Sequence, residues 1–114
     1  AKTEESTPKI EQRLFWIPEE QKANQLVRIL REEKGTVFVF VKAKERAYQV
    51  WRILENKGFK DVTYIHSDLP QDAREQAVAD FKSGKYRVII ATDVMGRGID
   101  VDDVAHVINY DVPR

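Results

Sequence analysis

The amino-acid sequence predicts an α/β domain with a mostly parallel sheet and helices on both faces. Strand-like runs alternate with amphipathic stretches of about a dozen residues, which is typical of βαβ units. The run Val37–Val41 is apolar at every position, as in a central parallel strand that is buried on both sides. Right-handed crossovers then place the helices on both faces of the sheet.

Length and composition fit this class and exclude others. The chain has 114 residues, a size that suits one domain, and its 19 basic and 19 acidic side chains give zero net charge. The absence of cysteine excludes disulfides, thiolate metal sites and thiol nucleophiles. No apolar run approaches the roughly 20 residues that span a membrane, so we expect no membrane partner. Zero net charge argues against a uniformly basic surface but allows a local basic face.

The first half of the chain predicts two strands and a helix between them. Ile10–Ile17 is rich in strand-forming residues and is closed by Pro18. Glu19–Glu33 has apolar residues at helical spacing and ends before Gly35. Val37–Val41 then forms the central strand.

The middle of the chain predicts two further helices around a strand. Lys44–Lys57 has one apolar face and is followed by Gly58, which is typical of a helix end. Val62–His66 is a short strand, and Gln71–Ser83 is the third helix. We expect the inward face of this last helix to consist of Ala73, Ala77, Val78 and Phe81.

Two short strands, Val88–Ala91 and Ala105–Asn109, complete the predicted sheet. In parallel α/β sheets, ligands bind beyond the carboxyl ends of the strands. The segments in that position are Lys42–Lys44, His66–Asp68 and Thr92–Asp100. They contain most of the polar side chains that could act specifically.

The segment after the fourth predicted strand is the most informative. Gly96 and Gly98 allow close backbone approach to a ligand, and Arg97 between them suits a phosphate or carboxylate. Asp100 suits a ribose hydroxyl pair. Composition alone favours a simpler interpretation, a tight turn with a solvated arginine and a capping aspartate.

Gln71 and Arg74 form a second candidate site because a spacing of three places both on one helix face. At the start of a helix they suit a phosphate backbone. The simpler alternative is a surface arginine that pairs with Asp68, Asp72 or Glu75.

Lys42, Lys44 and Arg46 form a small basic cluster, for which a solvated helix start is the simpler interpretation. Trp16 and Trp51 could stack on bases. Trp51 lies on the apolar stripe of its helix, so core packing is favoured there.

Several catalytic patterns are missing from the sequence. Gly84-Lys85 lacks the spacing of a P-loop, so the chain has no triphosphate cradle of its own. Neither an HExxH motif nor a GxSxG motif occurs. His66 and His106 are far apart in sequence, and we expect no metal site.

Taken together, the motifs resemble those of the DEAD-box RNA helicases. The stretch ATDVMGRGIDV (Ala91–Val101) resembles motif V, and Gln71-Asp72-Ala73-Arg74 matches the Q-x-x-R element. VFVFVKAK (Val37–Lys44) resembles motif IV, and VINYDVP (Val107–Pro113) follows in the expected order. The resemblance extends from about Lys9 to Arg114, nearly the whole chain.

This resemblance implies a RecA-like three-layer sandwich, the second domain of an ATP-dependent RNA helicase. The family clamps RNA and ATP with Mg²⁺ between two RecA-like domains. It therefore implies RNA, the N-terminal RecA-like domain and adaptor proteins as partners. It also implies an intracellular protein, in the cytoplasm or nucleus.

The resemblance assigns roles to individual residues. RNA-binding roles fall on Thr92, Arg74, Gln71, Ser67 and Lys42. Asp100 would bind the ATP ribose, Gly98 would also belong to the ATP-binding site, and Arg97 would bridge to the other domain. Two positions depart from the family pattern, since Ala43 stands where a hydroxyl residue is usual and Ser67 where glycine is usual. Ala43 loses one phosphate hydrogen bond, and Ser67 adds bulk at a close approach.

We interpret residues 1–8 as the end of an interdomain linker and residues 9–114 as a partial second domain, incomplete at its C-terminal end. Motif VI, the P-loop and the DEAD carboxylates are absent from the sequence, so we expect the chain alone to be inactive as an ATPase. Two alternatives remain at this stage: a platform for protein partners, or the same domain of another superfamily 2 nucleic-acid translocase.

Overall fold

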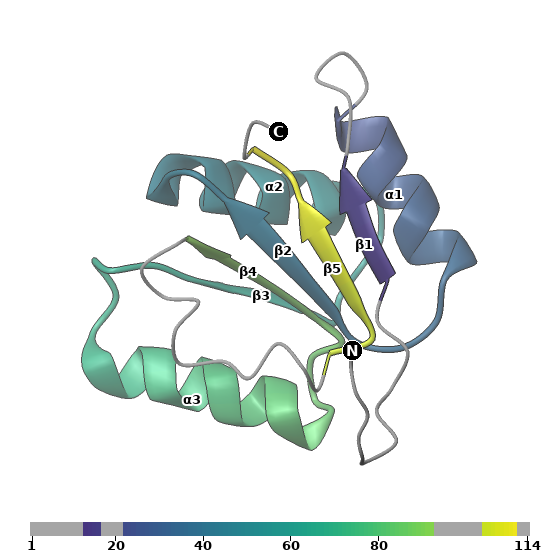
Figure 1. The fold of residues 1–114 in the computed structure, drawn as a ribbon. Helices are drawn as coiled ribbons and strands as arrows, with labels where there is room; N and C mark the ends of the chain where they lie inside the picture. Colours follow the sequence, from purple (N-terminus) through teal and green to yellow (C-terminus); the bar gives the residue numbers. More distant parts are fainter. Residues whose placement is uncertain (1–12, 17–21, 93–103, 112–114) are drawn as a thin grey trace, which may run out of the picture.

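The computed structural model describes residues 13–16, 22–92 and 104–111. Five strands and three helices lie within these ranges (Figure 1). The strands are β1 (Arg13–Trp16), β2 (Val37–Val41), β3 (Val62–Ile65), β4 (Val88–Thr92) and β5 (His106–Asn109). The helices are α1 (Lys22–Glu32), α2 (Lys44–Asn56) and α3 (Gln71–Ser83).

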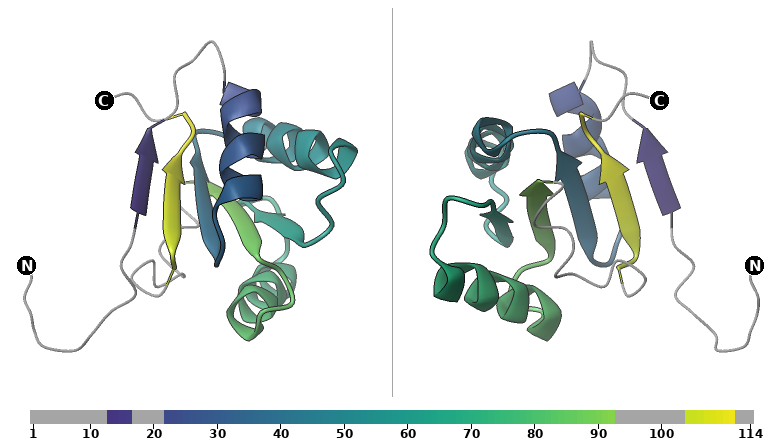
Figure 2. Two further views of the ribbon diagram at one scale, coloured as in Figure 1. Left: turned by 90° about the vertical axis from the view of Figure 1, so that its right-hand side faces the viewer. Right: turned by 60° about the vertical axis from the view of Figure 1, so that its left-hand side comes forward.

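The strands form one sheet in the order β1-β5-β2-β4-β3, and every neighbouring pair is parallel. Figure 2 shows β1, β5 and β2 side by side with their arrowheads at the same end. The apolar run Val37–Val41 lies at the centre of the sheet, as the sequence predicts. Because every strand runs the same way, all the carboxyl ends meet at one edge.

The two sides of the central strand contact different helices. Val37, Val39 and Val41 belong to a core cluster that also contains buried side chains of α1 and α2. Phe38 points to the other side, into a cluster with Ala77 and Phe81 of α3. The sheet is therefore covered on both faces, which confirms the predicted α/β three-layer class.

The predicted elements differ from the observed ones by a residue or so within the described ranges. One expectation about the core is wrong: Ala73 is exposed, whereas Ala77 and Phe81 are buried. Residues four apart on a helix drift by about 40° per step, so Ala73 lies about 80° away from Phe81. α3 ends in a left-handed cap at Gly84 (φ 94°), which only glycine adopts without strain.

Arg87, just before β4, contacts the connection between α1 and β2. Its guanidinium donates to the carbonyl oxygens of Gly35 (2.9 Å), Leu30 (3.0 Å) and Glu33 (2.5 Å). This arrangement ties the α1–β2 connection to the start of β4.

Among the described helices, none is long and apolar enough to cross a membrane.

Candidate nucleic-acid interface

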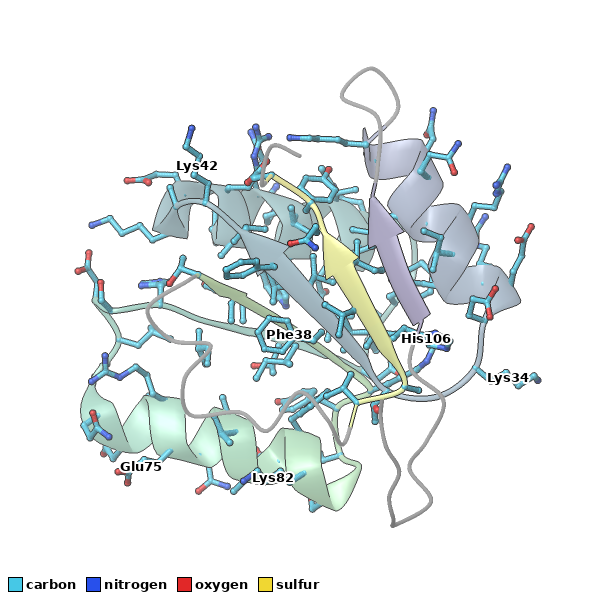
Figure 3. All side chains as sticks on the ribbon, in the orientation of Figure 1. Lys34, Phe38, Lys42, Glu75, Lys82 and His106 are labelled. Atoms are coloured by element: carbon cyan, nitrogen blue, oxygen red, sulfur yellow. The ribbon has the colours of Figure 1, made fainter. Side chains whose placement is uncertain are left out.

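Polar and cationic side chains gather where neighbouring strands end. β2 ends opposite β4, with Val41 paired to Thr92, and β3 ends opposite the same strand, with Ile65 paired to Ala91. The segments that follow β2 and β3 therefore lie at one edge of the sheet, as predicted. In Figure 3, Lys42 lies beyond the arrowhead of β2, at the opposite end of the sheet from Lys34 and His106. We call this edge, with Lys42, Lys44, Ser67, Arg74 and Thr92, the strand-end rim.

A pocket of about 530 Å³ opens at the rim between α1, α2 and the residues after β5. Asp111 lies in its wall with a side chain only 5% exposed. Its carboxylate accepts hydrogen bonds from Lys22 Nζ (2.6 Å) and from the backbone N–H of Lys42 (3.1 Å), and it forms an ion pair with Arg46 Nε (3.2 Å). One carboxylate thus joins three segments that are far apart in sequence.

The electrostatics of Asp111 follow from this geometry. Burial alone raises the pKa of a carboxyl. The hydrogen bonds from Lys22 and from the Lys42 backbone, together with the positive charge of Arg46, outweigh that effect and hold the pKa of Asp111 below its ordinary value. Lys22 and Arg46 also lie over the ring of Tyr110, at 5.1 and 5.9 Å from its centroid. Asp111 is therefore ionised, and its carboxylate connects α1, α2 and the residues after β5 beneath the rim.

A second ion pair links the loops after β2 and β3. Lys44 Nζ contacts the Asp68 carboxylate, and both side chains are about half exposed. The hydrogen bond and the opposite charge raise the pKa of Lys44 and lower that of Asp68. The backbone N–H of Asp68 also donates to His66 Nδ1 at 3.2 Å, which shapes the corner after β3. Because the ion pair is exposed, a phosphate can replace the aspartate at little cost.

Gln71 and Arg74 come together as their spacing predicts. The Arg74 guanidinium donates to Gln71 Oε1 and to the carbonyl oxygen of Ser67 (3.4 Å). Gln71 in turn donates to Glu75 at 2.8 Å. Arg74 is half-buried and therefore held in one orientation beside the Ser67 corner. Through Gln71, Arg74 is linked to Glu75, one of the acids in the simpler alternative, by a chain of two hydrogen bonds.

Thr92 is the last residue of β4 and is only 9% exposed, so it lies at the base of the rim. Ala43 is the N-cap of α2, and it has no side-chain oxygen to cap the helix. Trp51 is half-buried against the core, and its indole N–H donates to the Val62 carbonyl oxygen (3.3 Å), in line with the predicted packing role. The predicted residues Arg97, Gly98 and Asp100 lie outside the described residues.

Sequence reasoning missed Asp111 and Lys22. Asp111 lies in the VINYDVP stretch that carries the family resemblance, but no role was assigned to it, and its contact with Lys22 joins residues 89 positions apart. The available signal was the NYD sequence at the end of β5, which places an acid beyond a predicted strand end. Within the described ranges, no group of three His, Cys, Asp or Glu residues is placed to hold a metal ion.

The rim therefore combines a row of cations with a buried hydroxyl on a rigid sheet edge, an arrangement suited to phosphate. Comparison with known proteins agrees with this chemistry. Residues 21–114 match the helicase conserved C-terminal domain. The chain belongs to this family and, within it, to the DEAD-box RNA helicases.

Two curated relatives illustrate the match. The chain is 40% identical over 104 residues to the ATP-dependent RNA helicase vasa of Drosophila melanogaster, covering 91% of this chain and 16% of vasa. It is 41% identical over 105 residues to a probable ATP-dependent RNA helicase of Methanocaldococcus jannaschii, covering 92% of this chain and 28% of that protein. The chain thus spans less than a third of either relative.

Known structures agree on the fold. Yeast (S. cerevisiae) Dbp5 bound to RNA and ADP BeF3 superposes with a TM-score of 0.75 at 31% identity, covering 90% of this chain and 26% of that one. The E. coli DEAD-box protein SrmB bound to the regulator of ribonuclease activity A gives 0.76 at 34% identity, covering 95% and 64%. These neighbours confirm the predicted RecA-like fold.

Proposed function

We propose that this chain is the RNA-clamping half of an ATP-dependent DEAD-box RNA helicase. The observation that carries the proposal is the strand-end rim, where Lys42 and Lys44 follow β2, Arg74 contacts the corner after β3 at Ser67, and Thr92 ends β4 between these two strands. Three cations and a hydroxyl on a rigid edge suit the sugar-phosphate backbone, which is the same in every sequence. Binding is therefore expected to be largely independent of sequence.

Each rim residue has a distinct role in this proposal. Arg74 is oriented by Gln71 and by the Ser67 carbonyl before RNA arrives, which reduces the entropy lost on binding. Lys44 exchanges the Asp68 carboxylate for a phosphate. Thr92 donates its hydroxyl to the strand, and Lys42 adds charge at the mouth of the pocket. Ser67 makes the weakest RNA contact of the set, because its hydroxymethyl group adds bulk at a point of close approach.

The nucleotide-binding roles concern the segment after β4. Asp100 holds the ATP ribose, Gly98 belongs to the same ATP-binding site, and Arg97 bridges to the N-terminal RecA-like domain when the two domains close. ATP with Mg²⁺ supplies the phosphoryl chemistry when bound between the domains. We interpret residues 9–114 as a partial domain that follows the linker residues 1–8. Because the sequence has no P-loop, this domain does not hydrolyse ATP alone. A parent of this kind acts where cellular RNA and ATP occur, in the cytoplasm or nucleus.

The first experiment measures the affinity of the chain for two unrelated single-stranded RNAs at low salt. Arg74→Ala is expected to weaken both by roughly tenfold, because a phosphate contact is lost whatever the sequence. Arg28→Ala is the matched control, since Arg28 is 63% exposed on α1 and pairs only with the equally exposed Glu32 in the described geometry. Unchanged affinity of the Arg74→Ala variant would remove Arg74 from the site.

The second experiment addresses ATP in the full-length parent. Asp100→Ala is expected to raise the KM for ATP, because a ribose contact is lost. An unaltered KM would assign Asp100 a purely local role in its turn. Comparing RNA with DNA as stimulators of the same ATPase separates an RNA helicase from a DNA translocase.

An adaptor protein is the second partner that we propose. SrmB, whose structure covers 95% of this chain, was determined bound to a regulator protein. Retention of a protein partner after RNase treatment would support an adaptor. Loss of that partner with the RNA would show that the association was RNA-mediated.

A further inference from the structure

One side of α2 carries an exposed row of residues that the proposed rim does not use in full. Lys44, Tyr48 and Arg52 occur at every fourth position and so follow one another along the helix, about 6 Å apart. Tyr48 is 45% exposed, unlike the other large apolar side chains of the described residues. We call these three residues the α2 row.

The Tyr48 ring rests on a rigid aromatic base. Its centroid lies 6.0 Å from those of both Trp51 and Tyr64, which are themselves 5.5 Å apart. Tyr64 stacks on His66 at 5.8 Å. The rings therefore form a continuous path from the corner after β3 to the outer side of α2. Trp51 and Tyr64 also pack against the core, so the base keeps its shape.

Positive charge flanks the exposed ring on both sides. The Arg52 guanidinium lies 5.9 Å from the centroid of the Tyr48 ring and donates to its hydroxyl oxygen at 3.2 Å. Lys44 lies one turn away on the other side, at the strand-end rim, in its exposed pair with Asp68. Two cations beside one exposed ring match the alternation of bases and phosphates along a single nucleic-acid strand.

We propose that the α2 row is an accessory site for single-stranded RNA that leaves the strand-end rim. One base stacks on Tyr48, and the flanking phosphates contact Lys44 and Arg52. Stacking of a base on an aromatic ring combined with backbone charge is the usual basis of sequence-independent single-strand binding. The site rests on the proposed RNA-binding function, and it lengthens the RNA segment that the domain holds.

The test compares short and long RNA on the intact chain. Oligouridylates of about 4 and about 12 nucleotides are titrated at about 50 mM salt, with binding followed by fluorescence anisotropy. Tyr48→Ala is expected to weaken the long RNA by roughly tenfold and to leave the short one within about twofold. Tyr48→Phe keeps the ring and should bind like the unaltered chain. Arg52→Gln provides a second, milder loss confined to the long RNA.

The matched control is Tyr86→Ala, because Tyr86 also lies beside a lysine, Lys85 at 5.8 Å, but just before β4 at the other end of the strands. Equal binding of long RNA by the unaltered chain and by Tyr48→Ala and Arg52→Gln would overturn the inference and leave the row to a protein partner. Loss of short RNA by Arg74→Ala, with no effect of Tyr48→Ala on long RNA, would refute only the accessory site. Absence of RNA binding at every length would refute the proposed function and the accessory site with it.

Discussion

Replacing Asp111 tests whether the strand-end rim depends on a buried charge. In Asp111→Ala, the Lys42 N–H and the Lys22 ammonium, which is 12% exposed, each lose the Asp111 carboxylate as an acceptor. A hydrogen bond that involves a charged group contributes about 1.5–3 kcal/mol. Arg46 is 37% exposed and adds little. We therefore expect the free energy of unfolding at pH 7 to fall by about 2–4 kcal/mol.

The pH dependence has a definite sign. The pKa of Asp111 is lowered in the folded state, so its contribution is complete above the pKa of the unfolded chain. That contribution is lost as the pH falls through the lowered folded-state value, below about pH 4. The difference between the unaltered chain and Asp111→Ala should therefore narrow in acid. Urea unfolding, followed by circular dichroism at a series of pH values, measures it.

Two further variants sharpen the test. Asp111→Asn keeps an oxygen for the Lys42 N–H but removes the charge, so its cost should be smaller than that of the alanine variant. Asp68→Ala removes a carboxylate from an exposed pair at the same rim and should change stability little. A cost below about 0.5 kcal/mol for Asp111→Ala, or a cost that stays constant through the acid range, would refute the reasoning.

Three other substitutions have expected outcomes that urea unfolding can check. Gly35→Ala should cost about 1–3 kcal/mol more than Gly58→Ala. Both glycines have φ near +100°, so the backbone strain is similar at the two positions. Only at Gly35 would an added Cβ clash, because it would lie 2.9 Å from the Cβ of Ala105. Equal costs of the two substitutions would exclude that clash. Arg87→Lys should cost about 2 kcal/mol, because an ammonium cannot reach all three carbonyl oxygens, and a neutral result would make the contacts dispensable. Ala43→Thr should add about 1 kcal/mol by capping α2 and should also strengthen RNA binding; unchanged stability would mean that the hydroxyl does not reach the helix N–H groups.

Much of the fold follows from local patterns. Val37–Val41 has no polar residue, so its position at the centre of the sheet was predictable from its apolar composition alone. The C-terminal end of α3 was predictable from Gly84, whose left-handed conformation ends the helix. The orientation of Ala73 was not, because the small drift between the helical period and a four-residue repeat decides whether the first turn faces the core.

The candidate site was predictable where it depends on spacing and not where it depends on topology. Gln71 and Arg74 share a helix face, and their contact follows from that spacing. Asp111 meets Lys42 only because β5 lies beside β2, an order that no local pattern reveals. Likewise, the aromatic path from His66 to Tyr48 joins β3 to α2 across the edge of the sheet. Long-range register is what the sequence alone leaves open.

A direct test of the central claim is a map of where RNA touches the chain. Backbone amide chemical shifts are followed by nuclear magnetic resonance as single-stranded RNA is added. If RNA binds at the strand-end rim, the perturbed amides should cluster at Lys42, Ser67, Arg74 and Thr92. The opposite ends of the strands, around Thr36 and Ala105, should stay unchanged. Perturbations centred on Thr36 and Ala105, or an absence of perturbation at the rim when RNA is bound, would contradict the account.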